Sequence, residues 1–274
     1  MLSALRKMPY LFDHLDAVGE LLALSPFGLI TDVDGTISEI APSPEEARVS
    51  PVCREQLMTL TKLLELVAAI SGRPVLEAKE MIGVEGMVYI GNHGLERWED
   101  GTVKFIEEVQ EYPAKVMVLL EELGDLLALE GIALENKGVA LAIHYRRCPD
   151  RELAKRMILE KIATSAIANE FRAVEGRMVV ELRPRQVGVN KGTAVETLVE
   201  RYYLRGGIYL GDDISDVDAF SVMHTRGFKG LALGVIDAET PHDVISEADF
   251  TLNGVGDVEH FLKWLAGVAP ALRQ

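Results

Sequence analysis

The feature of this sequence that most constrains the fold is a short apolar run that ends in two carboxylates. Phe27 to Thr31 has the pattern of a buried strand, and Asp32, Asp34, Gly35 and Thr36 follow within five residues. Side chains two positions apart in an extended chain share a face, so Asp32 and Asp34 project into one small space. Two anions there repel unless a divalent cation neutralises them or one stays protonated. Gly35 permits a sharp turn whose N–H groups suit an anion such as phosphate. An Asp-x-Asp-Gly turn alone is also typical of an ordinary acidic loop.

The pattern of strands and helices around this run predicts an α/β fold. Further apolar strands are predicted at 66–70, 87–90, 207–210, 230–235 and 248–252, with helices at 75–82, 214–223 and 255–266 and an amphipathic helix before the first strand. Strands that alternate with helices indicate a Rossmann-like doubly wound parallel sheet. In such folds the ligand site lies beyond the carboxyl ends of the strands.

A second pattern interrupts the first from about Gly101. Helices are predicted at 114–129 and 151–169, and strands at 132–137, 139–147, 171–174 and 178–183. This order predicts an inserted α+β cap domain at 104–186, between the two halves of a core at 1–103 and 187–274. From Gly131 to Lys191 there are 12 Lys and Arg residues against 7 Asp and Glu, so the insertion is locally basic in an acidic chain.

Composition limits the partners that this chain can have. A formal net charge of −15 argues against nucleic acid or an anionic membrane as a partner. Cys53 and Cys148 suggest neither a disulfide framework nor a CxxC metal site, which favours the reducing cytoplasm. Charged residues interrupt the first 24 positions, so we expect no signal peptide, and no apolar run is long enough to span a membrane.

Polar residues also follow other predicted strands or begin a helix. Ser71 follows the second strand, and Lys191 opens the helix after the insertion, where the helix dipole adds to its charge. Asp212, Asp213 and Asp216 follow the strand at 207–210, so a second acidic cluster lies at a second strand end. Each residue alone has an ordinary explanation, such as an exposed lysine or a helix cap. Together they are far more specific.

This set, in this chain order, resembles the four motifs of the haloacid dehalogenase superfamily of phosphohydrolases. Longer stretches resemble the trehalose-6-phosphate phosphatases within it, and they are Asp32 to Pro42, Ser71 to Arg73, Gly91 to Glu96, Val180 to Pro184 and Gly211 to Asp216. That family often has an aromatic residue where Val33 stands and a leucine where Ile37 stands, and neither departure touches the chemistry.

The resemblance implies a Mg²⁺-dependent hydrolysis of trehalose 6-phosphate through an aspartyl-phosphate. Asp32 is then the nucleophile and Asp34 the general acid and base, while Ser71 and Lys191 grip the phosphate. The Mg²⁺ ligands are Asp32, Asp34 through its backbone carbonyl, and Asp212, with support from Asp213 or Asp216.

Sugar specificity is expected in the insertion, which the resemblance identifies as a lid. Substrate contacts are carried over to Arg73, Glu135, Lys137, Arg146 and Glu181, although a surface salt bridge explains each equally well. Two alternatives stay open, namely another sugar phosphatase or phosphomannomutase-like isomerase, and a non-catalytic carbohydrate-phosphate sensor. We expect a monomer whose partner is a small sugar phosphate.

Overall fold

The chain folds into two compact units, which we describe from a computed structural model. One contains Met1–Val103 with Val189–Gln274, and the other contains Lys104–Gly188. The structure describes residues 9–176, 178–185 and 187–272, so the beginning of the predicted N-terminal helix and the predicted boundary at 186 lie outside the described residues. Among the described helices, none has both the length and the hydropathy needed to cross a bilayer.

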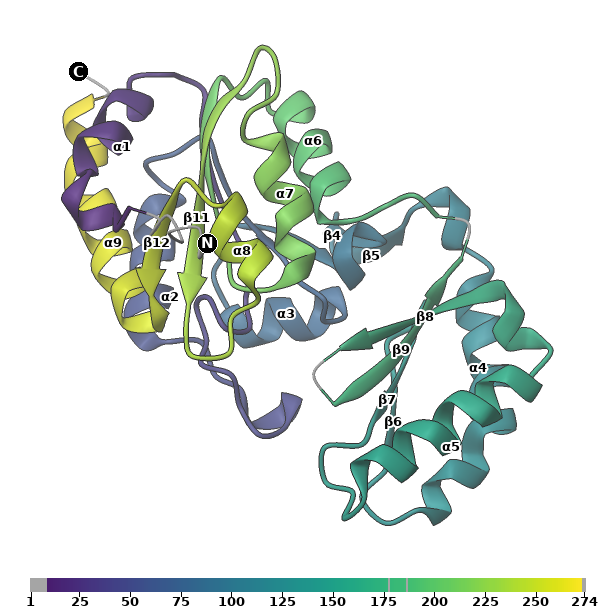
Figure 1. Cartoon of the computed structure of the whole chain (residues 1–274). Helices are drawn as coiled ribbons and strands as arrows, with labels where there is room; N and C mark the ends of the chain where they lie inside the picture. Colours follow the sequence, from purple (N-terminus) through teal and green to yellow (C-terminus); the bar gives the residue numbers. More distant parts are fainter. Residues whose placement is uncertain (1–8, 177, 186, 273–274) are drawn as a thin grey trace. The chain divides into compact units, whose positions relative to one another are not determined.

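The first unit is built on a mainly parallel sheet (Figure 1). Its eight described strands follow the order β12-β11-β10-β1-β2-β3-β4-β5. Their bounds are β1 Phe27–Thr31, β2 Leu66–Ile70, β3 Val88–Gly91, β4 Glu96–Glu99, β5 Thr102–Phe105, β10 Gly206–Gly211, β11 Lys229–Ile236 and β12 Phe250–Asn253. The strands from β12 to β3 pair in parallel, and β4 pairs with β3 in the antiparallel direction. The predicted α/β fold with a dominant parallel sheet is confirmed.

Both faces of this sheet are buried, because neighbouring residues of each strand enter different cores. Leu29 packs in one core with residues of α1, α2 and α9, while Ile30 packs in the other with residues of α6, α7 and α8 (Figure 1). The helices of this unit are α1 Leu15–Leu22, α2 Pro51–Leu60, α3 Val75–Ile82, α6 Lys191–Arg201, α7 Val217–Val222, α8 His242–Glu247 and α9 Gly254–Val268. A doubly wound sheet requires this arrangement, because helices cover both of its faces and the side chains on both faces of each strand are then buried.

Register brings the ends of the central strands together. Thr31 at the end of β1 pairs with Leu210 of β10 on one side and with Ala69 of β2 on the other. Because these strands are parallel, the residues that follow them emerge at the same edge of the sheet. Asp32, Asp212 and Ser71 are those residues.

The second unit is a four-stranded antiparallel sheet in the order β6-β7-β9-β8. Its elements are β6 Ala133–Asn136, β7 Leu141–His144, β8 Phe171–Gly176, β9 Val179–Pro184, α4 Tyr112–Leu123 and α5 Arg151–Thr164, and both helices lie along one side of the sheet (Figure 1). In β9, Val180 and Leu182 are fully buried on the face opposite to Glu181. One face is therefore apolar, and the other carries polar side chains.

Several predicted boundaries are wrong for local reasons. The helix predicted at 114–129 ends at Leu123 and continues as a 3₁₀ segment, and the helix predicted at 151–169 ends at Thr164. The hairpin of β4 and β5 was missed, although Asp100 and Gly101 between them both have positive φ, as a tight hairpin turn requires. The short helix α8 was missed as well.

Candidate active site

The loop after β1 is a tight, well-anchored turn. The Asp32 backbone N–H donates to the Leu210 carbonyl at 2.8 Å, which keeps this residue extended beside β10. Gly35 then adopts a φ of +82°, and the side chains of Val33 and Ile37 are completely buried beneath the turn. A Cβ on Gly35 would lie 2.1 Å from Oδ2 of Asp212. Only glycine therefore allows this loop to approach the acidic loop after β10.

A buried ammonium joins the ends of two strands. Lys191 opens α6, where Asn190 and Thr193 form a reciprocal capping box. The Lys191 Nζ lies 3.0 Å from Oδ2 of Asp32 and 2.7 Å from Oδ1 of Asp216, and Lys191 is only 2% exposed. Burial alone lowers the pKa of Lys191, but the two carboxylates outweigh it, and the net shift is upward. The lysine is therefore charged and held as part of the site.

Asp216 organises the loop that follows β10. Its Oδ1 accepts hydrogen bonds from Lys191 and, at 2.7 Å, from the Tyr209 hydroxyl. Its Oδ2 accepts from the backbone N–H groups of Asp212 and Asp213 at 3.2 and 3.0 Å. Asp216 is fully buried, and four donors fix its carboxylate. This arrangement suits an orienting role rather than direct contact with a ligand.

Three carboxylates converge in this region. Ligand oxygens of Asp32, Asp212 and Asp216 lie within 4.8 Å of one another. Burial, followed by repulsion from Asp216, raises the pKa of Asp212 to about 8. Burial also raises the pKa of Asp32, and Lys191 offsets only part of this effect. A cluster of hard oxygen donors whose charges are this unfavourable without a counter-ion fits a divalent cation such as Mg²⁺.

Asp34 and Arg73 form a bidentate ion pair. The Arg73 Nε donates to Oδ2 of Asp34 at 2.6 Å, and its Nη2 donates to Oδ1 at 2.7 Å. Ser71 is buried, and its hydroxyl accepts from the Arg73 backbone N–H at 3.1 Å. Arg73 was predicted as a substrate contact, and here it contacts the predicted general acid. The Asp34 side chain is not part of the carboxylate cluster described above.

In the second unit, a row of charged side chains crosses the polar face of the sheet. Glu135 of β6 and Glu181 of β9 both pair in register with Ala142 of β7, so they lie on one face. Lys137 Nζ lies 3.2 Å from Oε1 of Glu181, and Arg183 Nε donates to Oε2 of Glu181 at 2.6 Å. This row can accept and donate hydrogen bonds to a polyhydroxyl ligand.

Glu135 is paired with a residue that was not predicted for the site. His144 Nε2 lies 2.6 Å from Oε2 of Glu135. Burial raises the pKa of Glu135, but His144 and then Lys137 outweigh it, and the net pKa is lowered. Glu135 therefore stays an anion that can accept hydrogen bonds.

Arg146 lies beyond the end of its strand, although a strand was predicted over 139–147. β7 ends at His144, and Arg146 is exposed in the turn that follows, where its carbonyl accepts a hydrogen bond from Arg151 Nε at 3.2 Å.

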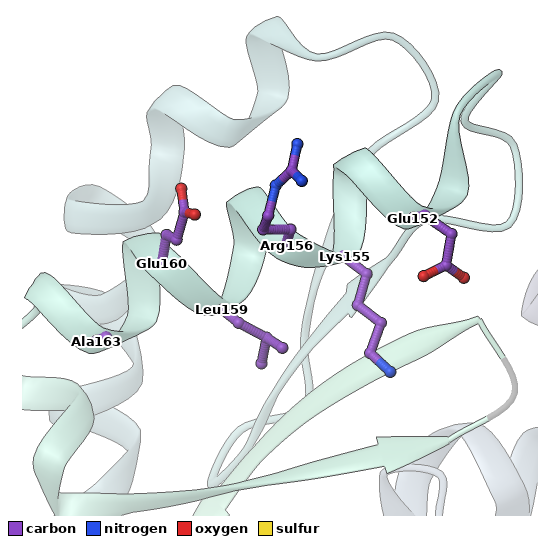
Figure 2. Close-up of a pocket in the computed structure, with 6 residues that line it drawn as sticks. All are labelled: Glu152, Lys155, Arg156, Leu159, Glu160 and Ala163. Atoms are coloured by element: carbon purple, nitrogen blue, oxygen red, sulfur yellow. The ribbon is translucent and has the colours of Figure 1, made fainter.

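Residues of α5 line a cavity of about 460 Å³ elsewhere in this unit (Figure 2). Its lining is Glu152, Lys155, Arg156, Leu159, Glu160 and Ala163, none of which was predicted as a site residue.

Sequence reasoning missed two residues that support the acidic cluster. Thr36 Oγ1 donates to Oδ1 of Asp212 at 3.2 Å, and Tyr209 donates to Asp216 from within β10. A weak signal existed for Tyr209, because its hydroxyl in a buried, otherwise apolar strand needs a partner. No local pattern links Thr36 with a residue 176 positions away.

Comparison with known proteins identifies the family. A family model described as trehalose-phosphatase matches residues 30–255. The chain belongs to the trehalose-phosphatase family. It is 29% identical over 247 residues to trehalose-6-phosphate phosphatase of Escherichia coli strain K12, covering 89% of this chain and 86% of that protein. It is also 30% identical over 275 residues to trehalose-phosphate phosphatase of Mycobacterium leprae, covering 95% of this chain but spanning only 63% of that relative.

Solved structures agree with the fold of a trehalose-phosphatase. The C-terminal domain of Candida albicans trehalose-6-phosphate phosphatase superposes with a TM-score of 0.75 at 21% identity, covering 95% of this chain and 98% of that one. This likeness confirms the predicted resemblance at the level of the fold.

The first prediction concerns the glycine in the turn after β1. Gly35→Ala should weaken both folding and cation binding, because the added methyl group meets the Asp212 carboxylate and needs a φ that alanine adopts poorly. We expect a stability loss of about 1–3 kcal/mol in urea unfolding and a higher Kd for Mg²⁺ by calorimetry. Gly101→Ala, which has a similar φ but an open environment, is the control for backbone strain alone. Equal Kd values in both variants would contradict the assigned contact.

The second prediction concerns Asp212 in the cation-free protein. Its folded pKa of about 8 lies above its ordinary value of 3.8, so ionisation destabilises the fold progressively between these pH values and by a constant amount above them. Asp212→Asn should therefore raise Tm at pH 8 in EDTA, and this gain should disappear near pH 4. Saturating Mg²⁺ should raise Tm of the native protein but not of the variant. A gain in Tm that does not depend on pH would contradict the raised pKa of Asp212. An equal increase of Tm with Mg²⁺ in both proteins would contradict its role as a cation ligand.

Proposed function

We propose that this chain is a Mg²⁺-dependent phosphatase that hydrolyses trehalose 6-phosphate to trehalose and inorganic phosphate. The observation that carries the proposal is the contact of Lys191 with Asp32 at the end of β1, within a cluster of carboxylates. This site lies in a member of the trehalose-phosphatase family. A phosphoryl group beside Lys191 would face the Asp32 carboxylate directly.

Asp32 is the proposed nucleophile. Its carboxylate attacks phosphorus, the bond to the sugar oxygen breaks, and an aspartyl-phosphate forms on Asp32. Lys191 stabilises negative charge on the phosphoryl oxygens, and the Ser71 hydroxyl donates to one of them. Bound Mg²⁺, held by Asp32, Asp212 and the backbone carbonyl of Asp34, would supply further neutralisation of that charge.

Asp34 is the proposed general acid and base. It protonates the departing sugar oxygen and then accepts a proton from the water that hydrolyses the aspartyl-phosphate. Arg73 fixes the plane of the Asp34 carboxylate through two hydrogen bonds. Asp216 holds Lys191 and the backbone of the Asp212 loop in place.

The second unit is the proposed cap that recognises the disaccharide. Glu135, Lys137 and Glu181 form one charged row, which matches a ligand with many hydroxyl groups. Arg146 is proposed as a further contact from its exposed turn. We also propose that the protein works as a monomer in the cytoplasm, where Cys53 and Cys148 remain free thiols.

A panel of sugar phosphates tests the function. With Mg²⁺, trehalose 6-phosphate should release inorganic phosphate faster than other sugar phosphates do. A mutase would convert its substrate without net release, and a sensor would bind without turnover. Preference for another sugar phosphate would retain the chemistry and reject the substrate.

The third prediction is that Asp32→Asn abolishes phosphate release. The amide keeps the size of the side chain but is a poor nucleophile, so kcat should fall by about a thousandfold or more. Far-UV circular dichroism should be unchanged. Asp16→Asn, on the exposed face of α1, is the matched control and should keep full activity. Substantial turnover by Asp32→Asn would mean that another group attacks phosphorus.

The fourth prediction separates sugar recognition from chemistry. A hydrogen bond to a charged group is worth about 1.5–3 kcal/mol, so Glu181→Ala should lower kcat/KM for trehalose 6-phosphate by about 10- to 150-fold. Turnover of a small aryl phosphate should fall far less. Glu175→Ala, an exposed residue of β8 paired with Lys155, is the control. Equal losses on both substrates would indicate a structural role for Glu181.

A further inference from the structure

The segment Gly91-Asn92-His93-Gly94-Leu95-Glu96 has no part in the proposed chemistry, yet its backbone is strained. Asn92, His93 and Gly94 have φ values of +47°, +57° and +114° in succession. Two consecutive non-glycine residues in this region are unfavourable and persist only where surrounding contacts impose them. The contacts of this turn therefore indicate what the strain achieves.

The strained turn holds the backbone of the loop that carries Ser71 and Arg73. The Asn92 N–H donates to the Arg73 carbonyl, and the His93 N–H donates to the Ser71 carbonyl, both at 2.9 Å. The His93 ring lies over Gly72, where an added Cβ would come within 2.7 Å of it. The strained turn therefore contacts the loop at Ser71, Gly72 and Arg73.

Glu96 ties this turn to the start of α3. Its Oε1 accepts a hydrogen bond from the Val75 N–H at 2.6 Å, and the Asn92 side chain also hydrogen-bonds to its carboxylate. Val75 is the first residue of α3 and follows the Ser71–Pro74 loop directly. An added Cβ on Gly91 would lie 2.3 Å from the Val75 nitrogen, so the two segments are in close contact.

A carboxylate at this position is costly, which argues that it has a purpose. Glu96 is only 4% exposed, and burial raises its pKa to about 7. The N-terminal end of α3 and the Asn92 side chain recover part of this cost. An apolar residue would avoid the burial penalty but could not accept the hydrogen bond from the Val75 N–H.

We propose that Glu96 is a positioning residue for the Ser71–Pro74 loop, acting through Val75 and Asn92 to place Arg73 against Asp34. The proposal rests on the proposed function only in its effect on catalysis. A chain of contacts carries it, from Glu96 to Val75 and Asn92, then to the loop backbone, and then through the Arg73 fork to Asp34.

Three substitutions test whether the reach of the side chain matters. Glu96→Gln keeps an oxygen at the same distance, Glu96→Asp keeps the charge but withdraws the oxygen, and Glu96→Ala removes both. Because displacement by about 1 Å costs up to about 100-fold in rate, we expect kcat to fall by about 10- to 100-fold for Ala and Asp, with a smaller change in KM. Gln should remain within about threefold of the native protein.

The order of the variants decides the outcome. A purely electrostatic role would make Asp the milder change and Gln the more severe, and this order would overturn the proposal. Near-native kcat in all three would also overturn it. If Glu96→Ala fails to fold, the comparison of Asp with Gln still decides. Glu77→Ala, an exposed acid in the first turn of α3, is the matched control and should be unchanged.

A double-mutant cycle tests the route through Arg73. In an Arg73→Ala background, Glu96→Asp should lower kcat by less than about threefold further, because its effect has already been lost. Losses that multiply would show that Glu96 acts elsewhere and would overturn this route.

Amide hydrogen exchange gives a reading independent of activity. A peptide that spans the Ser71–Pro74 loop and the first turn of α3 should exchange faster in Glu96→Asp than in the native protein or Glu96→Gln, while β2 should be unaffected. Unchanged exchange in Glu96→Asp would overturn the proposal. If the native protein fails to hydrolyse trehalose 6-phosphate, the proposed function falls, and the exchange experiment still decides the role of Glu96.

Discussion

The site depends on the ion pairs that the buried ammonium of Lys191 forms with two carboxylates. This ammonium lies between Asp32 and Asp216 and is almost completely shielded from water. Without it, neighbouring carboxylates would face one another at the ends of β1 and β10 with no compensating charge, which is strongly unfavourable. The same side chain that allows these strands to end in acids is also the proposed contact of the phosphoryl group. Structural need and proposed chemistry therefore coincide in one residue.

The parallel sheet places the other residues of the site around this charge. The register of β1 with β10 and β2 delivers Asp32, Asp212 and Ser71 to one edge. Apolar layers on both faces hold the strands rigidly, so the loops can be polar and strained without loss of the fold. Glycine is required where these loops approach one another most closely, as Gly35 shows against Asp212.

The charged groups of the two units lie in different electrostatic environments. In the first, the buried carboxylates of Asp32 and Asp212 lie close together and have raised pKa values, as expected for the proposed cation and phosphate site. In the second, Glu135 and Glu181 are each paired with a basic side chain along a sheet face, and the pKa of Glu135 is lowered. The first environment suits reaction at phosphorus, and the second suits recognition of neutral hydroxyl groups.

The sequence by itself determined the elements with strong local signals. Leu66–Ile70 was predicted to the residue, and the acids that follow β1 and β10 were found because each group follows an apolar run directly. Tertiary structure alone decided the partners. The pairing of Arg73 with Asp34, and of Asp216 with Lys191, depends on strand order and register, which bring together residues that lie 39 and 25 positions apart in the chain. The β4–β5 hairpin, by contrast, has a local signal in the sequence, the Asp100-Gly101 pair at its turn. The role of Glu96 has no such signal and depends on what packs against it, because local propensity does not encode long-range contacts.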